Sequence, residues 1–279
     1  MEIVNSKFNN FASILTFGSN VLIDGVTIDQ GYVIAFPSPD NRMLSLNLQN
    51  STIISSRIFA KEINNVNVIN TNFQYNLQQS LYYRYFKTFR NPLVVDIVGE
   101  YMEADGSALS ISSLVASSAT ISNSVFTKMK QYGAVYLKGV GITAHVTNST
   151  FEDNKSEKGG AGICLDTIYM ATIDTSKFIN NLQMSMFDEM NGDTVGGGAI
   201  YQIRSLMTTN NCYFYNNYAS STGGAVFSYL SYRYTSQDDV RFSLSIYSPI
   251  LTVVYSKLCQ VWRCIGNSIF QSKYHSDHQ

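Results

Sequence analysis

One stretch decides the fold of this chain: NSTFEDNKSEKGGAGI, residues 148–163. It opens with the phrase Asn148-Ser149-Thr150-Phe151, places Asn154 three residues after the phenylalanine, and closes with Gly159-Gly160 before small and aliphatic residues. Parts of the same pattern recur on both sides of it. A pattern that recurs about every 20 to 50 residues is the signature of a solenoid, in which each repeat forms one supersecondary unit.

The opening phrase has the form Asn or Thr, then Ser, Cys or Thr, then any residue, then Phe. Its phenylalanines are Phe8, Phe73, Phe126, Phe151, Phe178, Phe214 and Phe270, and Ile28 and Ile53 take the same position in two further segments. Successive anchors lie 20 to 27 residues apart, except for intervals of 36, 53 and 56 residues. The two longest intervals are close to twice the usual one, so each predicts a coil whose phrase has drifted. The spacing predicts about ten or eleven coils.

The phrase predicts short, stacked strands. Residues two apart in a strand share a face, so Ser149 and Phe151 point to the same side. Stacking would place Phe on Phe in the interior, where burying each ring contributes about 2–3 kcal/mol. We expect the asparagine after each strand, such as Asn154, to form a sharp bend, because Asn tolerates left-handed backbone angles. Glycine pairs predict a second bend and a close approach of neighbouring backbones; they occur at 159–160, 197–198 and 223–224.

These patterns predict an all-β chain that forms a single right-handed parallel β-helix over residues 1–279, because the right-handed crossover is the permitted one for parallel strands. Interruptions of the period predict loop insertions near residues 74–108, 182–195 and 229–242. Neither end shows a capping helix, so we expect the ends to be uncapped. The chain is then either a fragment of a longer protein or a unit that stacks end to end with other chains, copies of itself included.

The composition narrows the classes of function. The net charge is −1 and only 14% of residues are charged, so the sequence gives no electrostatic reason to bind nucleic acid. No apolar stretch reaches the roughly 18 residues of a membrane-spanning helix, and the first residues lack the pattern of a secretory signal. The four cysteines predict small buried hydrophobes rather than a zinc site, and no cofactor or metal is expected; they are Cys164, Cys212, Cys259 and Cys264.

The coupled Phe-x-x-Asn and Gly-Gly-Ala phrases resemble the repeat of chlamydial polymorphic outer membrane proteins, which is also seen in large surface proteins of protists. More broadly, they resemble the pectin-lyase-like group of right-handed β-helices. The resemblance is clearest over residues 120–228. It implies a β-helix that lies outside the cell or on its surface. The chain departs from the bacterial members because it shows neither a signal peptide nor a tail long enough for a membrane-spanning barrel.

Two insertions mix tyrosine with arginine, which suits contacts to glycans or to other protein chains. The predicted binding residues are Tyr82, Tyr83, Arg84, Tyr85, Tyr232, Arg233 and Tyr234. Three sequons predict N-glycosylation outside a cell, at Asn50, Asn148 and Asn154.

The resemblance to pectin-lyase-like proteins also raises an alternative, a carbohydrate-active enzyme acting on a polysaccharide. Gln237-Asp238-Asp239 resembles part of a polygalacturonase active site, and Asp238, Asp239 and Arg241 are its candidate catalytic residues. The other motifs of that family, Asn-x-Asp, Gly-His-Gly and Arg-x-Lys, are missing. The first hypothesis is therefore a non-catalytic structural or adhesive surface protein, a glycoprotein that contacts glycans or proteins and could assemble into filaments.

Overall fold

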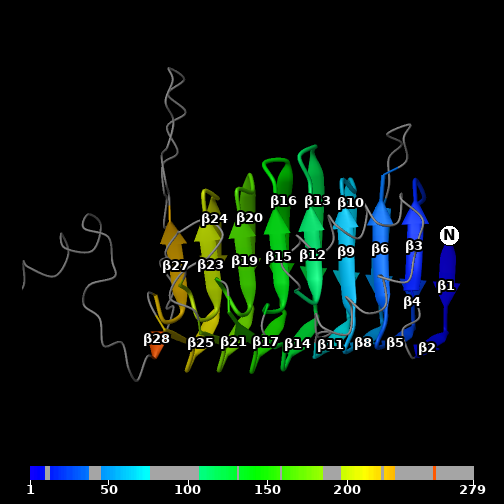
Figure 1. Ribbon diagram of the computed structural model, residues 1–279. Coiled ribbons are helices and arrows are strands. Elements are labelled where there is room, and N and C mark those ends of the chain that lie inside the picture. The colour runs from blue at the N-terminus through cyan, green and yellow to red at the C-terminus, as the bar shows by residue number, and fades with distance from the viewer. Residues whose placement is uncertain are drawn as a thin grey trace, which may run out of the picture.

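The computed structural model describes residues 1–9, 13–37, 45–75, 107–130, 132–157, 159–184, 196–220, 223–229 and 254–255. Within these ranges the chain forms strands and no helix, and so contains no helix able to cross a membrane. Figure 1 shows the strands side by side in rows that follow the chain from one end to the other. The strands belong to three long sheets, A, B and C, and one short sheet, D.

Each long sheet takes one strand from every turn of the chain. Sheet A comprises β1 (Glu2–Val4), β4 (Val21–Asp24), β7 (Ser45–Gln49), β10 (Asn65–Ile69), β13 (Ser117–Ser122), β16 (Ile142–Thr147), β20 (Met170–Asp174) and β24 (Met207–Asn210). Sheet B comprises β2 (Lys7–Asn9), β5 (Thr27–Asp29), β8 (Thr52–Ile54), β11 (Asn72–Gln74), β14 (Val125–Thr127), β17 (Thr150–Glu152), β21 (Lys177–Ile179), β25 (Tyr213–Tyr215) and β28 (Val254–Tyr255).

Sheet C comprises β3 (Ser13–Phe17), β6 (Tyr32–Phe36), β9 (Arg57–Lys61), β12 (Leu109–Ser112), β15 (Val135–Lys138), β19 (Ile163–Asp166), β23 (Ile200–Ile203) and β27 (Val226–Tyr229). Sheet D comprises β18 (Lys155–Ser156), β22 (Leu182–Gln183) and β26 (Tyr218–Ala219). Neighbouring strands in all four sheets are parallel. Near the start of the chain Ile3 lies opposite Ile23, and near its end Phe214 lies opposite Val254.

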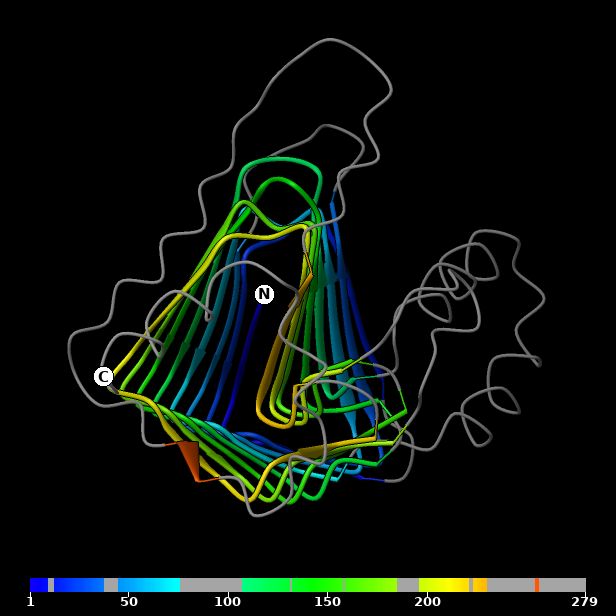
Figure 2. The ribbon, with the colours of Figure 1, turned by 90° about the vertical axis from the view of Figure 1, so that its left-hand side faces the viewer.

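The chain winds as a right-handed parallel β-helix, as the sequence predicts. In the end-on view of Figure 2, sheets A, B and C form the three sides of a coil, and the later coils lie nearer the viewer. The path from A through B to C runs counter-clockwise towards the viewer, which is right-handed. This agrees with the general preference of parallel strands for right-handed crossovers. The total of ten or eleven coils stays a prediction.

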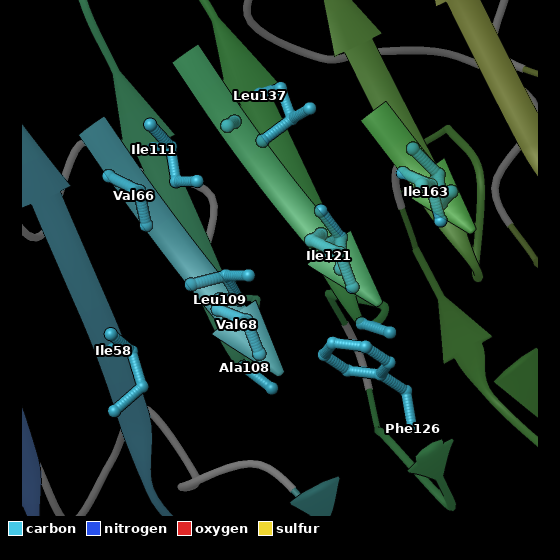
Figure 3. Packing of buried hydrophobic residues seen from close by; sticks show 14 of the residues in the cluster. Ile58, Val66, Val68, Ala108, Leu109, Ile111, Ile121, Phe126, Leu137 and Ile163 are labelled. Atoms are coloured by element: carbon cyan, nitrogen blue, oxygen red, sulfur yellow. The ribbon is translucent and has the colours of Figure 1, made fainter. Parts of the chain in front are cut away.

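A phenylalanine ladder, formed by Phe73, Phe126, Phe151, Phe178 and Phe214, fills the interior beside sheet B, as the repeated phrase predicts. All five rings are buried. Successive centroids are 4.5, 5.0, 4.8 and 4.9 Å apart, and the rings are parallel to within 10°. Figure 3 shows Phe126 in the interior with Ile121 and other aliphatic side chains of the core. Equivalent residues of successive coils therefore stack on one another, and this fixes the register.

A serine ladder accompanies the rings at the position two residues before each phenylalanine. Ser124, Ser149 and Ser176 are buried. The backbone N–H of Ser124 donates to Ser149 Oγ at 3.2 Å, and that of Ser149 donates to Ser176 Oγ at 3.2 Å. Each hydroxyl in turn donates to a carbonyl of its own coil, as Ser149 Oγ does to Thr147 O at 2.9 Å. Small hydroxyl residues thus occupy this position because they satisfy backbone groups at the buried turn between sheets A and B.

The structure assigns the two asparagines of the repeat differently from the sequence prediction. The left-handed bend falls on the first asparagine of the phrase, with φ of 45° at Asn148 and 51° at Asn211, and on the residue before the second, with φ of 55° at Asp153. The second asparagine is buried and has no positive φ. The prediction that Asn154 forms the bend is therefore wrong by one residue.

Asn154, Asn181 and Asn217 form a buried asparagine ladder instead. Asn154 Nδ2 donates to Asn181 Oδ1 at 3.0 Å, and Asn181 Nδ2 donates to Asn217 Oδ1 at 2.9 Å. Both Nδ2 atoms also donate to carbonyls inside the stack, those of Phe126 at 3.1 Å and Phe151 at 2.9 Å. The amides are needed here because an unpaired polar group at such a buried turn would be costly.

The 53-residue interval between Phe73 and Phe126 contains an insertion, not a hidden coil. Phe73 pairs directly with Phe126 and Leu109 with Ile58, so the coils on either side of the interval are neighbours. The hidden coil predicted there is wrong, because the anchor spacing alone does not separate an extra coil from an inserted loop. In the 56-residue interval, Val254 lies opposite Phe214, as a coil with a drifted phrase predicts. Most of the three predicted insertions lies outside the described residues, namely 76–106, 185–195 and 230–242.

The inner strands of sheet C, from β6 to β23, are largely buried on both faces, unlike those of sheets A and B. Strand β16 of sheet A alternates between buried and more exposed residues, whereas every residue of β6 and β23 in sheet C is buried. The outward side chains of sheet C include a second apolar cluster of Tyr136, Cys164, Tyr201 and Ile203, against which Phe227 packs. A strand buried on both faces reads as a nearly continuous apolar run, which explains Tyr32–Phe36 and, apart from the buried Gln202, Ile200–Ile203.

Candidate functional site

The predicted binding and catalytic residues lie outside the described residues. They are Tyr82, Tyr83, Arg84, Tyr85, Tyr232, Arg233, Tyr234, Asp238, Asp239 and Arg241. A role for any of them stays a prediction. The site is therefore sought on the faces that the described coils present.

The three sequons occupy two different environments. Asn50 and Asn148 are exposed at the corner between sheets A and B. Asn148 Nδ2 donates to Asn123 Oδ1 at 2.8 Å, and Asn50 Nδ2 to Asp24 Oδ1 at 2.8 Å. Asn154 belongs to the asparagine ladder and is fully buried, so the folded coil does not present its amide to solvent. Glycosylation of the folded chain thus stays a prediction for Asn50 and Asn148 only.

Asp166, Asp174 and Arg204, three charged residues of the described later coils, do not converge on one site. Arg204 and Asp166 form an ion pair at 3.1 Å where β19 and β23 end. Asp174 ends β20 in sheet A, so the three residues do not form one acid–base cluster. Among the described residues, no group of three or more His, Cys, Asp or Glu side chains could hold a metal ion. Glycoside hydrolysis needs two carboxylates placed across the bond, and no such pair forms among these three residues.

Two groups of the described coils have shifted pKa values, and both shifts have structural causes. Hydrogen bonds from the Asn50 and Gln49 side chains lower the pKa of Asp24, a residue of the exposed corner. Burial raises the pKa of the Cys212 thiol, which takes the serine position in its coil and donates to Asn210 O at 3.3 Å. Cys164 and Cys212 are buried, as predicted from the sequence, and neither forms a disulfide. The Cys212 thiol is thus a packing group rather than a poised nucleophile.

The outer faces of sheets A and B carry rows of mainly uncharged polar side chains. Along sheet A, parallel pairing aligns Asn67, Thr120, His145, Thr172 and Thr208. Along sheet B, it aligns Asn72, Val125, Thr150, Lys177 and Tyr213. Successive members of a row belong to successive coils, about 4.8 Å apart. The stack therefore presents flat, regular faces, and a coil with different outward side chains can be recognised by comparison with its neighbours.

The unusual coil is that of β25, where both outward positions are tyrosine. Tyr213 and Tyr215 flank the buried Phe214, and Tyr218 follows on β26 of sheet D. The three residues, named here the tyrosine cluster, are 42%, 47% and 48% exposed. The rings of Tyr213 and Tyr215 are parallel to within 9°, with centroids 6.2 Å apart. They are exposed because they occupy the outer face of the strand while Phe214 and Cys212 occupy the inner one.

The tyrosine cluster is unpaired and nearly balanced in charge. Within the described coils, none of its three hydroxyls has a hydrogen-bond partner in the structure. Lys177 lies beside Tyr213 and Ile179 beside Tyr215 in the register of β21 and β25. Asn216 Nδ2 donates to Asn180 Oδ1 at 2.9 Å between the sheets, and Asn180 Nδ2 donates to Asp153 at 3.1 Å. Aromatic faces, free hydroxyls and amides are thus gathered on one surface.

Sequence reasoning missed this cluster because tyrosine is abundant, at 19 residues, and scattered. The signal that could have found it is alternation within one phrase. In Tyr213-Phe214-Tyr215 the phenylalanine is the inward anchor, so both tyrosines must point outward. No other copy of the phrase places aromatic residues on both sides of its anchor.

Comparison with known proteins agrees with the geometry of the repeat. Two segments, residues 148–166 and 211–229, match the model of the Chlamydia polymorphic membrane protein repeat. Each begins at the left-handed asparagine of one coil, and both extend through the glycine pair into a strand of sheet C. No curated protein and no solved structure gives a significant match. The chain therefore carries repeats similar to those of the Chlamydia polymorphic membrane proteins, folded as coils of a parallel β-helix.

Proposed function

We propose that this chain is a non-catalytic structural or adhesive β-helix protein of a cell surface. The observation that carries the proposal is the repeat match within a continuous stack, because the polymorphic membrane proteins are surface proteins of the Chlamydia outer membrane. The stack supplies flat polar faces and, in the described coils, no group of three or more His, Cys, Asp or Glu side chains that could hold a metal ion.

The size of these faces favours weak, repeated contacts. Eight strands of sheet A span about 34 Å, and a five-residue strand is about 16 Å long. One face thus offers about 550 Å² when the two lengths are multiplied. A standard protein interface buries about 800 Å² of each partner. A single sheet is smaller than that, so adhesion through it would depend on many copies or on specific side chains such as the tyrosine cluster.

Surface labelling of the source cells tests the location. Lys7, Lys155 and Lys177 are exposed on the coils and would react with a membrane-impermeant amine reagent. We expect labelled peptides that contain these lysines from intact cells, with a cytosolic protein of the same cells as the unlabelled control. Labelling that appears only after lysis would contradict the proposal.

We also propose that the stack can extend by end-to-end contacts with other chains. Coils of the described stack join through parallel backbone pairing, and a coil of another chain could add to the stack by the same pairing. Sedimentation at increasing protein concentration should reveal larger species, and electron microscopy should show rods. A monomer that persists at every concentration would rule this part out.

A further inference from the structure

We propose that the tyrosine cluster, Tyr213, Tyr215 and Tyr218, is a binding site for neutral pyranose oligosaccharides. This inference rests on the proposed adhesive function and names the ligand class. Three lines of observation support it: the orientation of the rings, the unpaired polar atoms around them, and the balance of charge.

Tyr213 and Tyr215 form a pair of exposed rings that the fold does not need. Tyr213 and Tyr215 stand on the outer face of β25, exposed and parallel, while the core beneath them is filled by Phe214 and Cys212. The positions beside them on β21 are Lys177 and Ile179, and those on β17 are Thr150 and Glu152. Smaller or charged residues therefore suffice at this place in earlier coils.

Polar groups of the cluster and beside it could supply the hydrogen bonds that sugar recognition also needs. A pyranose ring has an apolar face of C–H groups and a rim of hydroxyls, so its site needs an aromatic face together with hydrogen-bonding groups. Aromatic side chains with a polar tip suit such surfaces, where one part of the contact is apolar and the other is wet. The three tyrosine hydroxyls have no partner in the described coils, and the exposed amide of Asn216 lies between Tyr215 and Tyr218 in the chain.

The balance of positive and negative residues around the tyrosine cluster favours a neutral ligand. In the register of the preceding strands, the charged residues that line up with the cluster are Lys155, Lys177 and Glu152, and Asp153 is linked to Asn216 through Asn180. Two positive and two negative groups leave no net field to favour an acidic polysaccharide. A protein partner would instead require a larger apolar core than three half-exposed tyrosines provide.

Isothermal titration calorimetry with cellotetraose and chitotetraose tests the site, with a galacturonic acid tetramer as the acidic comparison. We expect weak binding of at least one neutral tetramer and weaker binding of the acidic one. Losing one ring weakens binding about two- to tenfold, and the variant Tyr213→Ala/Tyr215→Ala about four- to hundredfold. The control is Tyr169→Ala, since Tyr169 is 62% exposed but has no ring contact within the described residues.

The variant Tyr213→Phe/Tyr215→Phe separates stacking from hydrogen bonding. It keeps the rings, so it should bind more tightly than the double alanine variant. Equal affinities of the two double variants would overturn the proposal. So would an unchanged affinity in the alanine variant, or no binding of either neutral tetramer, which would point to a protein partner. The surface-labelling experiment on intact cells does not depend on sugar binding. Labelled lysines without sugar binding would therefore refute the tyrosine site but not the proposed surface function.

Discussion

Replacing Phe151 by alanine removes a ring that is stacked between Phe126 at 5.0 Å and Phe178 at 4.8 Å. The side chain is fully buried, so the change leaves a cavity in the interior of the stack. A buried Phe→Ala change costs about 3–5 kcal/mol, and two ring pairs of about 0.5–1.5 kcal/mol each place this site at the upper end. We therefore expect the free energy of unfolding to fall by about 4–5 kcal/mol.

The matched control is Phe8→Ala, which changes the same residue at the same position of the phrase. Phe8 is only partly buried and its one neighbour in the register is Ile28. Most of the burial energy of a Phe is then lost but no ring pair is broken, so this change should cost only about 1.5–2.5 kcal/mol. Urea unfolding followed by circular dichroism compares the two variants by their main transition, because a stack of coils need not unfold in one step. If Phe151→Ala costs no more than Phe8→Ala, the ladder does not stabilise the fold as argued.

Other positions give further expected outcomes. The change Asn181→Ala removes the amide that bonds to Phe151 O and Asn217 Oδ1, so it should lower the free energy of unfolding by about 2–4 kcal/mol. The control Asn65→Ala, at an exposed position of β10, should lower it by less than about 1 kcal/mol in the same urea assay, and similar losses would contradict the role of the buried ladder. The change Gly160→Ala places a Cβ 2.1 Å from Ile163 O at a φ of +60°, so the variant should be insoluble or far less stable. A soluble variant with an unchanged free energy of unfolding would refute the close approach of the two backbones. Because burial raises the pKa of Cys212, a thiol reagent at mildly alkaline pH should modify this residue in urea but not in the folded chain, as peptide mass spectrometry would reveal. If the chain is glycosylated after folding, peptide mass shifts should appear at Asn50 or Asn148 and not at buried Asn154.

The stacking of coils could be predicted from the sequence because it uses identical residues. A phenylalanine that recurs at coil spacing, with a small residue two places earlier, indicates one inward face, and Phe126, Phe151 and Phe178 occupy it. The glycine bends were equally visible, since Gly160 and Gly197 take φ of 60° and 69°. At these positions the local preference of the residue and its stacking between coils favour the same structure, so one sequence is sufficient to predict it.

Other features could not be predicted because the same residue type, or the same spacing, has two different structural roles in the repeat. Asn148 and Asn154 look alike in the repeat, yet one takes the left-handed bend and the other bonds within the interior. The spacing from Phe73 to Phe126 equals two coils, yet the two rings stack directly at 4.5 Å. The second apolar face of sheet C and the outward tyrosines of β25 depend on which residues lie side by side in the register, which the sequence does not state.

Engineered disulfides test the register of the parallel β-helix most directly. Thr120 and His145 are 25 residues apart in the chain but lie opposite each other on neighbouring strands of sheet A. Neighbouring strands are about 4.8 Å apart, within the range of Cα separations, about 4.4–6.8 Å, that a disulfide joins. We predict that Thr120→Cys/His145→Cys forms the cross-link on mild oxidation, detected by peptide mass spectrometry. The pair Thr120→Cys/Thr147→Cys, displaced by two residues, should not form it, and preferential cross-linking of that second pair would contradict the fold.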